Sequence, residues 1–294
     1  MKKEKDNIIY TIFAIVLIMI LTYIPLFQLL YYSFTNWNLL SSEYNFIGLQ
    51  NYEWLFAGTG SKYLWNALYV TVIYSLGTIF FTVVGGLLLA ILLKNNTRLN
   101  SFCRSIIFLP RYISLSAAAI IFLWILNSNN GILNQILLKF NIMGFDWLGN
   151  STTALISLIV VSAWKNIGYG MLIYIAAMAN IPSKFYDSAK LDGANRFEQF
   201  KVVTFPYLKS SIIFLTITSF IASMRAFQTI DIMTEGGPFR STEVFIYLIY
   251  RYIMVDFKAG RASAAAVIFF VFLIIVIILL LNLLKKYSER NEEW

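Results

Sequence analysis

Long uninterrupted apolar runs constrain the fold of this chain more than any other feature of its sequence. The last run, residues 264–284, contains one polar side chain, Asn282, and no charge. A helix of about 20 apolar residues can cross the hydrocarbon core of a bilayer, where lipid offers no other partner to backbone N–H and C=O groups. With 59% hydrophobic and 13% charged residues, the chain also lies outside the range of soluble globular domains. We therefore expect an all-α integral membrane protein.

Six apolar runs are long enough, or nearly so, to be transmembrane helices. They cover approximately residues 8–32, 68–93, 106–126, 153–177, 211–227 and 264–284. The first run is too long for the apolar core of a secretory signal, and no small-residue cleavage pattern follows it, so we expect it to remain as a span. No internal repeat or low-complexity tract divides the chain, which predicts a single membrane domain over residues 1–294.

The distribution of positive charge predicts the orientation of these spans. If the N-terminus lies in the cytoplasm, the cytoplasmic segments hold 14 Lys and Arg side chains and the outer segments hold 6, from a total of 23. Cytoplasmic loops of membrane proteins carry an excess of this kind. Both termini of a multi-pass protein are therefore expected in the cytoplasm, and the formal net charge of +8 needs no nucleic-acid partner to explain it.

The missing residue types limit the chemistry that this chain can perform. It has no histidine and a single cysteine, Cys103, which removes the commonest general base, an internal disulfide and any cysteine-built metal site. It also lacks the G-x-x-x-x-G-K-[ST] sequence of a nucleotide-binding loop. The pair Gly85–Gly86 is better explained by close helix packing, and the stretch Gly236–Pro238 by a turn on the outer side. We expect no enzyme activity, metal or cofactor in this chain.

A polar segment, residues 182–206, separates the fourth and fifth runs. Ser183 can cap a first short helix, and Gly193 can supply the left-handed conformation that ends it. Asn195, followed three residues later by Glu198, has the form of a capping box and predicts a second helix from the next residue onwards. The segment is either a structured loop whose aromatic side chains rest on the membrane surface, or a site that another protein binds.

The spacing within this segment resembles the EAA motif of binding-protein-dependent ABC importer permeases. That motif reads Glu-Ala-Ala, three residues, Gly, nine residues, Ile, any residue, Leu, Pro. The matching positions here are Asp187, Ser188, Ala189, Gly193, Val203, Phe205 and Pro206. Further stretches resemble the sugar-permease branch of the family, which includes the maltose and multiple-sugar permeases; in chain order they are SFTNWNLL, FIGLQNYEWLF, FCRSIIFLP, SAWKNIGYGMLIY and MTEGGPFRSTEV. Together they extend the resemblance over nearly the whole chain.

The resemblance implies a type I ABC importer permease fold with six transmembrane helices and a cytoplasmic coupling helix, in the plasma (inner) membrane of a bacterium. In such an importer two permeases pair around the substrate pathway, and two separate ATPase subunits bind ATP and Mg beneath them. An extracytoplasmic solute-binding protein delivers the carbohydrate from outside. The expected partners are therefore a second, homologous permease, two ATPase subunits, a binding protein and membrane lipid.

The resemblance also implies which residues of the polar segment contact the ATPase. Transferred by position, the candidates are Phe185, Asp187, Ser188, Ala189, Asp192, Gly193, Ala194 and Phe197. Asp187 stands where the family has Glu and is shorter by one methylene group. A charged contact through Asp187 and an apolar contact through Phe185 and Phe197 therefore both remain open.

The substrate pathway implied by the maltose-permease branch includes cations within the spans. By motif alignment its residues are Arg111, Lys165, Asn166, Tyr169, Ser219, Ser223 and Arg225. Intramembrane cations usually face a cavity or the bundle interior, although Arg111 lies near the cytoplasmic edge of its span, where extension to lipid phosphate explains it equally well. Arg111 and Arg225 stand where Tyr and Gln would be expected, and a guanidinium suits a carboxylate.

The expected function is that of the permease subunit of an ATP-driven, binding-protein-dependent carbohydrate importer. An acidic oligosaccharide, such as a uronate-containing disaccharide, and a neutral oligosaccharide are equally supported as substrates, with glycerol phosphate as a further alternative. An ion-coupled secondary transporter is a different class that the sequence favours less. Such proteins often show inverted repeats and intramembrane carboxylates, and neither is apparent in this sequence.

Overall fold

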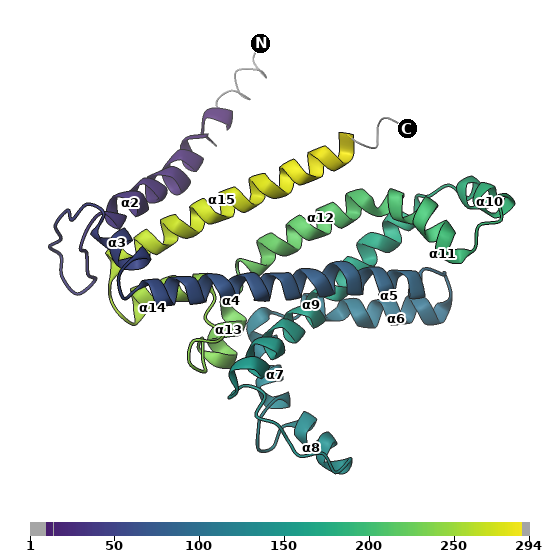
Figure 1. The fold of residues 1–294 in the computed structure, drawn as a ribbon, viewed down its shortest axis with the longest axis horizontal. Coiled ribbons are helices and arrows are strands. Elements are labelled where there is room, and N and C mark those ends of the chain that lie inside the picture. The colour runs from purple at the N-terminus through teal and green to yellow at the C-terminus, as the bar shows by residue number, and fades with distance from the viewer. Residues whose placement is uncertain (1–9, 14, 290–294) are drawn as a thin grey trace. The chain divides into compact units, whose positions relative to one another are not determined.

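The computed structural model describes residues 10–13 and 15–289, with side chains as far as residue 282. Within these residues every regular element is a helix, and strand-like pairing is limited to an isolated bridge between Thr35 and Phe46 (Figure 1). The predicted all-α class is confirmed. The first two positions of the first predicted span, residues 8 and 9, lie outside the described residues.

Five helices of the described chain are long and apolar enough to cross a membrane. They are Tyr10–Ser33, Ser61–Leu93, Ser151–Ala179, Arg196–Ser223 and Ala259–Asn282. They coincide with the first, second, fourth, fifth and sixth predicted spans. The fifth differs most from the prediction: its helix begins well before residue 211, and it ends at Ser223 rather than at residue 227.

The third predicted span is bent, which corrects the expectation of one helix over residues 106–126. It consists of α6 (Arg98–Phe108), the 3-10 turn η3 (Leu109–Tyr112) and α7 (Leu115–Ile125), and its two limbs are bent by 105°. Pro110 lacks the N–H that would bond the carbonyl of residue 106, and its ring clashes with that carbonyl. Ser114 then starts α7 by accepting a hydrogen bond from the backbone N–H of Ala117 at 3.1 Å. If this bent pair is one span, the described chain has six.

The remaining helices complete the chain order. Their bounds are η1 (Met19–Tyr23), α2 (Ile24–Ser33), α3 (Gln50–Phe56), α4 (Ser61–Phe80), η2 (Phe81–Gly85), α5 (Gly86–Leu93), α8 (Ile132–Lys139), α9 (Ser151–Ala179), α10 (Ser183–Leu191), α11 (Arg196–Gln199), η4 (Phe200–Thr204), α12 (Phe205–Ser223), α13 (Gln228–Thr234), α14 (Phe245–Met254) and α15 (Ala259–Glu289). The elements η1, η2 and η4 are π-helical turns. Each lies inside a long helix: η1 within Tyr10–Ser33, η2 between α4 and α5, and η4 between α11 and α12.

The described residues divide into two compact units. The first comprises the chain up to Trp65 together with Leu248–Ile278, and the second comprises Asn66–Tyr247 together with the residues from Leu279 onwards.

In the first unit, a buried amide ties the loop after α2 to α3. The Asn51 side chain donates to the carbonyl of Ser33 at 2.9 Å and to the carbonyl of Thr35 at 2.8 Å. A Cβ added at Gly260, at the start of α15, would overlap the same Thr35 carbonyl. The start of α15 can therefore approach this loop closely only with glycine at that position.

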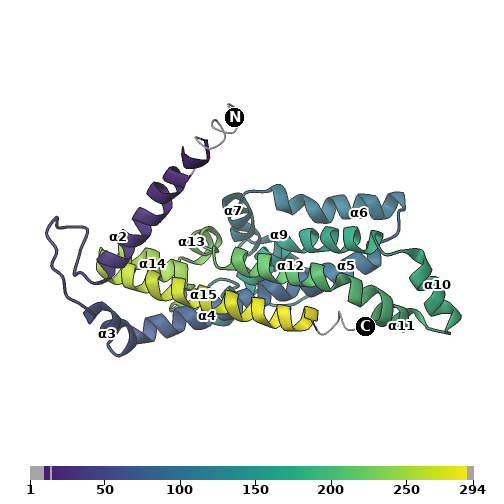
Figure 2. The ribbon, with the colours of Figure 1, turned by 90° about the horizontal axis from the view of Figure 1, so that it is seen from above.

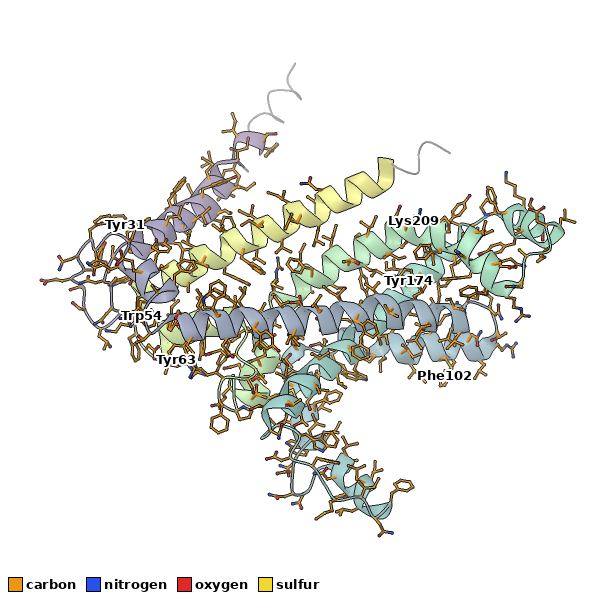
Figure 3. The ribbon with its side chains drawn as sticks, viewed as in Figure 1. Tyr31, Trp54, Tyr63, Phe102, Tyr174 and Lys209 are labelled. Carbon is orange, nitrogen blue, oxygen red and sulfur yellow. The ribbon has the colours of Figure 1, made fainter. Side chains whose placement is uncertain are left out.

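Aromatic side chains of the first unit surround the same loop, among them Tyr31 and Trp54 (Figure 3). The rings of Tyr31 and Tyr44 meet edge to face, with 6.3 Å between their centroids. The Arg261 guanidinium lies 4.0 Å from the centroid of a Trp54 ring, close enough for a cation–π attraction. These contacts give the loop a rigid aromatic covering.

In the second unit, α9 is the central helix and packs against α5, α6 and α12 (Figures 1 and 2). The centre of this packing is completely buried and consists of Ala90, Met171, Tyr174, Leu208 and Leu215. The close helix packing predicted for the Gly85–Gly86 pair is confirmed, because a Cβ at Gly86 would lie 2.9 Å from the backbone carbon of Gly170 on α9. The turn predicted at Gly236–Pro238 is also confirmed, with φ +78° at Gly236.

The polar segment after α9 folds as two short helices at one end of the second unit (Figures 1 and 2). Gly193 has φ +80° and ends α10, as predicted. The capping box is confirmed: Asn195 Oδ1 accepts from the N–H of Glu198 at 3.0 Å, and Glu198 Oε2 accepts from the N–H of Asn195 at 2.7 Å. The prediction that Ser183 caps α10 is wrong. Pro182 takes that position, because its extended ψ turns the chain into the helix, and Ser183 is the first helical residue.

Candidate functional site

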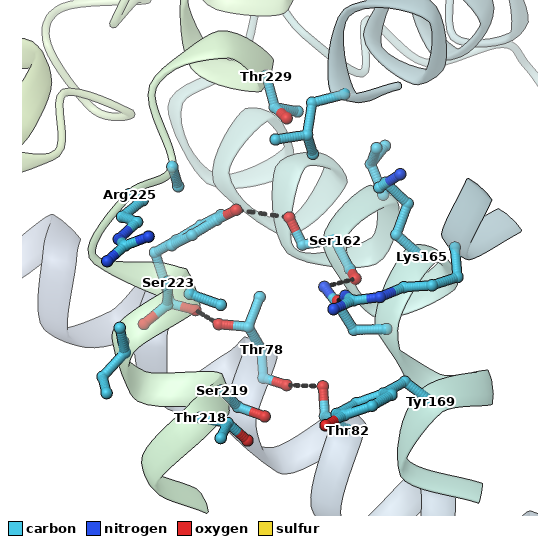
Figure 4. Close-up of a pocket in the computed structure, with 18 residues that line it drawn as sticks. Thr78, Thr82, Ser162, Lys165, Tyr169, Thr218, Ser219, Ser223, Arg225 and Thr229 are labelled. Atoms are coloured by element: carbon cyan, nitrogen blue, oxygen red, sulfur yellow. Dashed lines mark hydrogen bonds between the residues drawn. The ribbon is translucent and has the colours of Figure 1, made fainter. Parts of the chain in front are cut away.

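The second unit contains a cavity of about 520 Å³ between α4, α9, the bend of the third span and α12 (Figure 4). All seven residues predicted for the substrate pathway line this cavity: Arg111, Lys165, Asn166, Tyr169, Ser219, Ser223 and Arg225. They come from the bend of the third span, from α9, and from α12 with the turn that follows it, and the structure brings them together. Their role in transport remains a prediction.

Arg111 is held at the cavity by α9. It lies in the 3-10 turn at the bend, where its guanidinium donates to Asn166 Oδ1 at 2.6 Å and lies 4.9 Å from the ring centroid of Tyr169. The Asn166 side chain in turn donates to the carbonyl of Ser162 at 2.8 Å, which fixes its oxygen toward Arg111. The side chain of Arg111 is therefore engaged at the cavity.

Lys165 lines the cavity, but its ammonium group is hydrogen-bonded to backbone carbonyls of the protein. The side chain is buried, with 7% of its surface exposed, and Nζ donates to the carbonyl of Ile113 and to that of Pro110, the latter at 3.3 Å. A buried ammonium is costly unless such acceptors surround it. Sequence reasoning placed Lys165 on the pathway but could not foresee these two acceptors, which lie more than 50 positions away in the chain.

Arg225 lies in the turn between α12 and α13, two residues beyond the end of α12. This position corrects the expectation that it belongs to the fifth span, and the reason is that α12 ends early, where the backbone N–H of Arg225 bonds the carbonyl of Ala222. Figure 4 shows Arg225 and Lys165 on opposite sides of the cavity. With Arg111, three cations line it, and no carboxylate occurs among its 18 described lining residues.

A row of hydroxyl groups on α4 and η2 forms another wall, which the sequence reasoning missed. Thr78 Oγ1 donates to the carbonyl of Tyr74 at 2.6 Å, and Thr82 Oγ1 donates to that of Thr78 at 2.8 Å. Across the cavity, Thr218 of α12 donates to the carbonyl of Phe214 at 2.8 Å. Because each hydroxyl has a single proton, these oxygens keep only acceptor capacity for the cavity.

A sequence signal for this wall exists. The second run places hydroxyl residues on one helical face, at Thr71, Ser75, Thr78 and Thr82, and one polar face on an otherwise apolar span indicates a buried polar environment. Ser75 also meets Ser223 of α12, with 3.0 Å between the two hydroxyl oxygens. Ser223 is 5% exposed, and its single hydroxyl proton is within reach of both Ser75 Oγ and the carbonyl of Phe220, so it joins α4 to α12 at the edge of the cavity.

The residues predicted to contact an ATPase divide between two faces of the polar segment. Phe185 and Phe197 are exposed, to 39% and 73%. Ala189 is buried against Ile181 and Val203, and Ala194 packs on the same cluster. Ala189 and Ala194 therefore pack the polar segment against the rest of the second unit, and Phe185 and Phe197 are accessible to a partner.

Asp187 is exposed and forms an ion pair with Lys190 at 3.2 Å on the same helix. Both side chains are more than 60% exposed, so the pair contributes little to stability. Asp192 and Ser188 are also exposed. Leu191 was not predicted as a contact residue, although 90% of its surface is exposed, more than for Phe185 or Phe197.

Comparisons with known proteins agree with this geometry. The family model described as "Binding-protein-dependent transport system inner membrane component" matches residues 82–293. The chain is 34% identical to the probable ABC transporter permease protein YurN of Bacillus subtilis, over 84% of this chain and 85% of that protein. It is 31% identical to the multiple sugar-binding transport system permease protein MsmF of Streptococcus mutans, over 87% of each.

Solved structures show the same fold. A chain of a bacterial ABC transporter involved in the import of the acidic polysaccharide alginate matches with a TM-score of 0.83 and 21% identity, over 96% of both chains. In a structure of the bacterial alginate transporter with an alginate pentasaccharide-bound periplasmic protein, the match has a TM-score of 0.74 and 20% identity, over 98% of this chain and 96% of that chain. The predicted importer permease fold is confirmed, and the chain belongs to the sugar-type branch of the binding-protein-dependent ABC transporter permeases.

Proposed function

We propose that this permease carries an acidic oligosaccharide, such as a uronate-containing disaccharide, through the cavity between α4, α9 and α12. The observation that supports the proposal most strongly is the charge of the cavity: Arg111, Lys165 and Arg225 line it without a carboxylate among the described lining residues. Arg111 is also stacked on Tyr169 and bonded to Asn166, an arrangement that presents a guanidinium in a fixed orientation.

The rest of the cavity suits a sugar. Its volume of about 520 Å³ lies within the usual range for small-molecule sites. Tyr169 supplies an aromatic face, and Thr78, Thr82 and Thr218 supply hydroxyl oxygens that accept hydrogen bonds from sugar hydroxyls.

A neutral oligosaccharide is the second candidate, and the hydroxyl wall is the observation that favours it. MsmF, by its name, belongs to a transport system that binds multiple sugars. The alginate importer, by its title, carries an acidic polysaccharide, but at 21% identity that likeness supports the fold and not the substrate. Glycerol phosphate is a third candidate, which the cations favour.

The partners proposed for this chain are those of a complete importer. They are a second, homologous permease, two ATPase subunits that hold ATP and Mg, and an extracytoplasmic solute-binding protein, in a bacterial inner membrane with both chain termini in the cytoplasm. The exposed Phe185 and Phe197 of the polar segment support an ATPase contact there. The structure with a periplasmic protein supports a binding protein by analogy with that importer.

Uptake by the reconstituted importer with its binding protein tests the substrate proposal. The probes are a neutral disaccharide and the same disaccharide with one sugar oxidised to a uronic acid. We expect Arg111→Gln and Arg225→Gln each to lower uptake of the acidic probe at least about tenfold, because each removes a charged hydrogen-bond donor. Uptake of a neutral probe should change less than about threefold.

The matched control is Arg98→Gln, which removes an exposed arginine outside the cavity and should leave uptake of both probes unchanged. Uptake of uncharged sugars only, unaffected by Arg225→Gln, would remove the acidic substrate and leave the neutral one.

A further inference from the structure

We infer that Lys165 is a positioning residue: it holds the bend of the third span in place and thereby directs Arg111 into the cavity. This assigns it a role other than the substrate contact expected from its position. The part that concerns the bend is independent of the substrate, and the part that concerns Arg111 rests on the proposed function.

The bend leaves backbone carbonyls without helical partners inside a membrane span. Helix N–H groups cease to reach them where α6 gives way to η3 and where α7 starts again at Leu115. Lipid offers no hydrogen bond to such groups, so partners must come from the protein. Lys165 supplies one for the carbonyl of Ile113, the residue that follows η3. It also bonds the carbonyl of Pro110, which in addition accepts from the backbone N–H of Ile113 at 3.2 Å.

The charge of Lys165 suits this place. The carbonyl end of a helical turn carries partial negative charge, which a cation stabilises. An ammonium has three donors and can bond both carbonyls at once. No carboxylate lies among the described residues that line the cavity, so these carbonyls are the acceptors that the structure gives the buried ammonium.

A second contact holds the other side of the bend. Gly168, one turn further along α9, packs so closely on the end of α6 that an added Cβ would overlap the carbonyl of Ile107 and lie 2.9 Å from Phe108 Cα. The helix α9 therefore contacts the chain before the bend through Gly168 and after it through Lys165. Arg111 lies between these two contacts, so its direction depends on both.

A distance measurement across the bend tests the first part. Two spin labels at Phe102 of α6 and Trp124 of α7 suit it, because both side chains are exposed, to 63% and 76%, and Figure 3 shows Phe102 on the outer side of its helix. The background variant is Cys103→Ser, since the chain has no other cysteine. A straight helix would separate positions 22 residues apart by about 33 Å, and the bend of 105° gives a shorter distance.

We expect Lys165→Met, in the assembled importer, to broaden the distance distribution and shift it to longer values. Lys165→Arg keeps a cationic donor and should retain the distribution of the parent. Lys165→Gln, which keeps a neutral donor, replaces Lys165→Met in the measurement if the latter does not assemble with its partners. If the variant without the cation loses transport but keeps the spin-label distance distribution of the parent, the inference is overturned. Lys165 would then act by direct contact with the substrate.

A double-mutant cycle tests the link to Arg111. If Lys165 acts on an acidic substrate through Arg111, Lys165→Met and Arg111→Gln should each raise KM for uptake of the acidic probe about tenfold, and the double variant should raise it no more than two- to threefold further. A direct contact from each residue would make the effects multiply to about a hundredfold. If the acidic probe is not carried at all, the proposed substrate fails, and the spin-label distances still decide the role of Lys165.

Discussion

At the scale of single residues, the buried side-chain amide of Asn51 joins two elements through contacts that the neighbouring sequence does not predict. Asn51 is 5% exposed and joins two carbonyls at the end of α2 to α3. The carbonyls belong to residues 16 and 18 positions earlier in the chain, so helix propensity around Asn51 says nothing of them. Lys165 is a parallel case, with acceptors on a different span.

Replacing this amide should destabilise the first unit. Asn51→Leu leaves the carbonyls of Ser33 and Thr35 buried without their donor, which costs about 2–4 kcal/mol in the free energy of unfolding. Thermal unfolding of the purified protein in detergent, followed by tryptophan fluorescence, measures the loss. The control is Asn129→Leu at an exposed loop position, expected to remain within about 0.5 kcal/mol of the parent. Equal unfolding temperatures for the two variants would show that the bridge contributes nothing.

At the scale of elements, two helices of the candidate site depend on features that hydropathy does not measure. The helix α4 presents hydroxyl oxygens to the cavity because their protons are bonded to its own backbone. The polar segment α10–α11 keeps its shape through Gly193 and the capping box, and it exposes Leu191 and Phe197. The local signals for the capping box and the glycine turn were readable from the sequence, because they depend on residues three or four positions apart.

The hydroxyl wall should contribute to substrate binding through its oxygen atoms, so a substitution that keeps the hydroxyl should keep uptake. Thr78→Val has the same shape without the oxygen, and it should lower sugar uptake about two- to twelvefold, the usual worth of one hydrogen bond. Thr78→Ser keeps the oxygen and should remain within about twofold of the parent. Uptake kinetics in proteoliposomes separate the two. Equal losses in both variants would indicate that the methyl group, and not the hydroxyl, matters at this position.

The turn between α10 and α11 should be sensitive to residue type because Gly193 has φ +80°. Gly193→Val forces a β-branched residue into a left-handed conformation, at a cost of about 1–2 kcal/mol, and displaces α11 relative to α10. We expect substrate-stimulated ATP hydrolysis by the assembled importer to fall about five- to thirtyfold. Gly193→Asn, which tolerates this conformation, should lose much less. Normal stimulation in Gly193→Val would remove the segment from the coupling path.

At the scale of the whole molecule, the number of spans was predictable and the shape of one was not. Runs of apolar residues locate helices because length and composition decide whether a helix can cross a bilayer. The bend at Pro110 was missed because an apolar count does not register a missing backbone N–H. The family resemblance predicted seven residues that line one cavity, although their role in transport remains a prediction. The acceptors of Lys165 were missed because they lie on a span distant in the sequence.

The orientation predicted from the charge distribution can be measured directly. We expect a fluorescent protein fused after the last residue to be fluorescent in a bacterial host, and alkaline phosphatase fused there to be inactive, because both report a cytoplasmic location. Fusion of the phosphatase after Lys139, at the end of α8, should give an active enzyme. The reverse pattern at both sites would invert the topology and place the polar segment outside the cell.

The π-helical turn η2 has a consequence for the length of the second span. It contains Thr82, which lines the cavity, and ends directly before Gly86, which packs on Gly170 of α9. One residue more or fewer at this turn would rotate everything beyond it by about 100°. The number of residues in this turn therefore sets the rotation of the cavity-facing side relative to the glycine contact. We expect single insertions and deletions here to disturb the helix more than substitutions on its lipid-facing side.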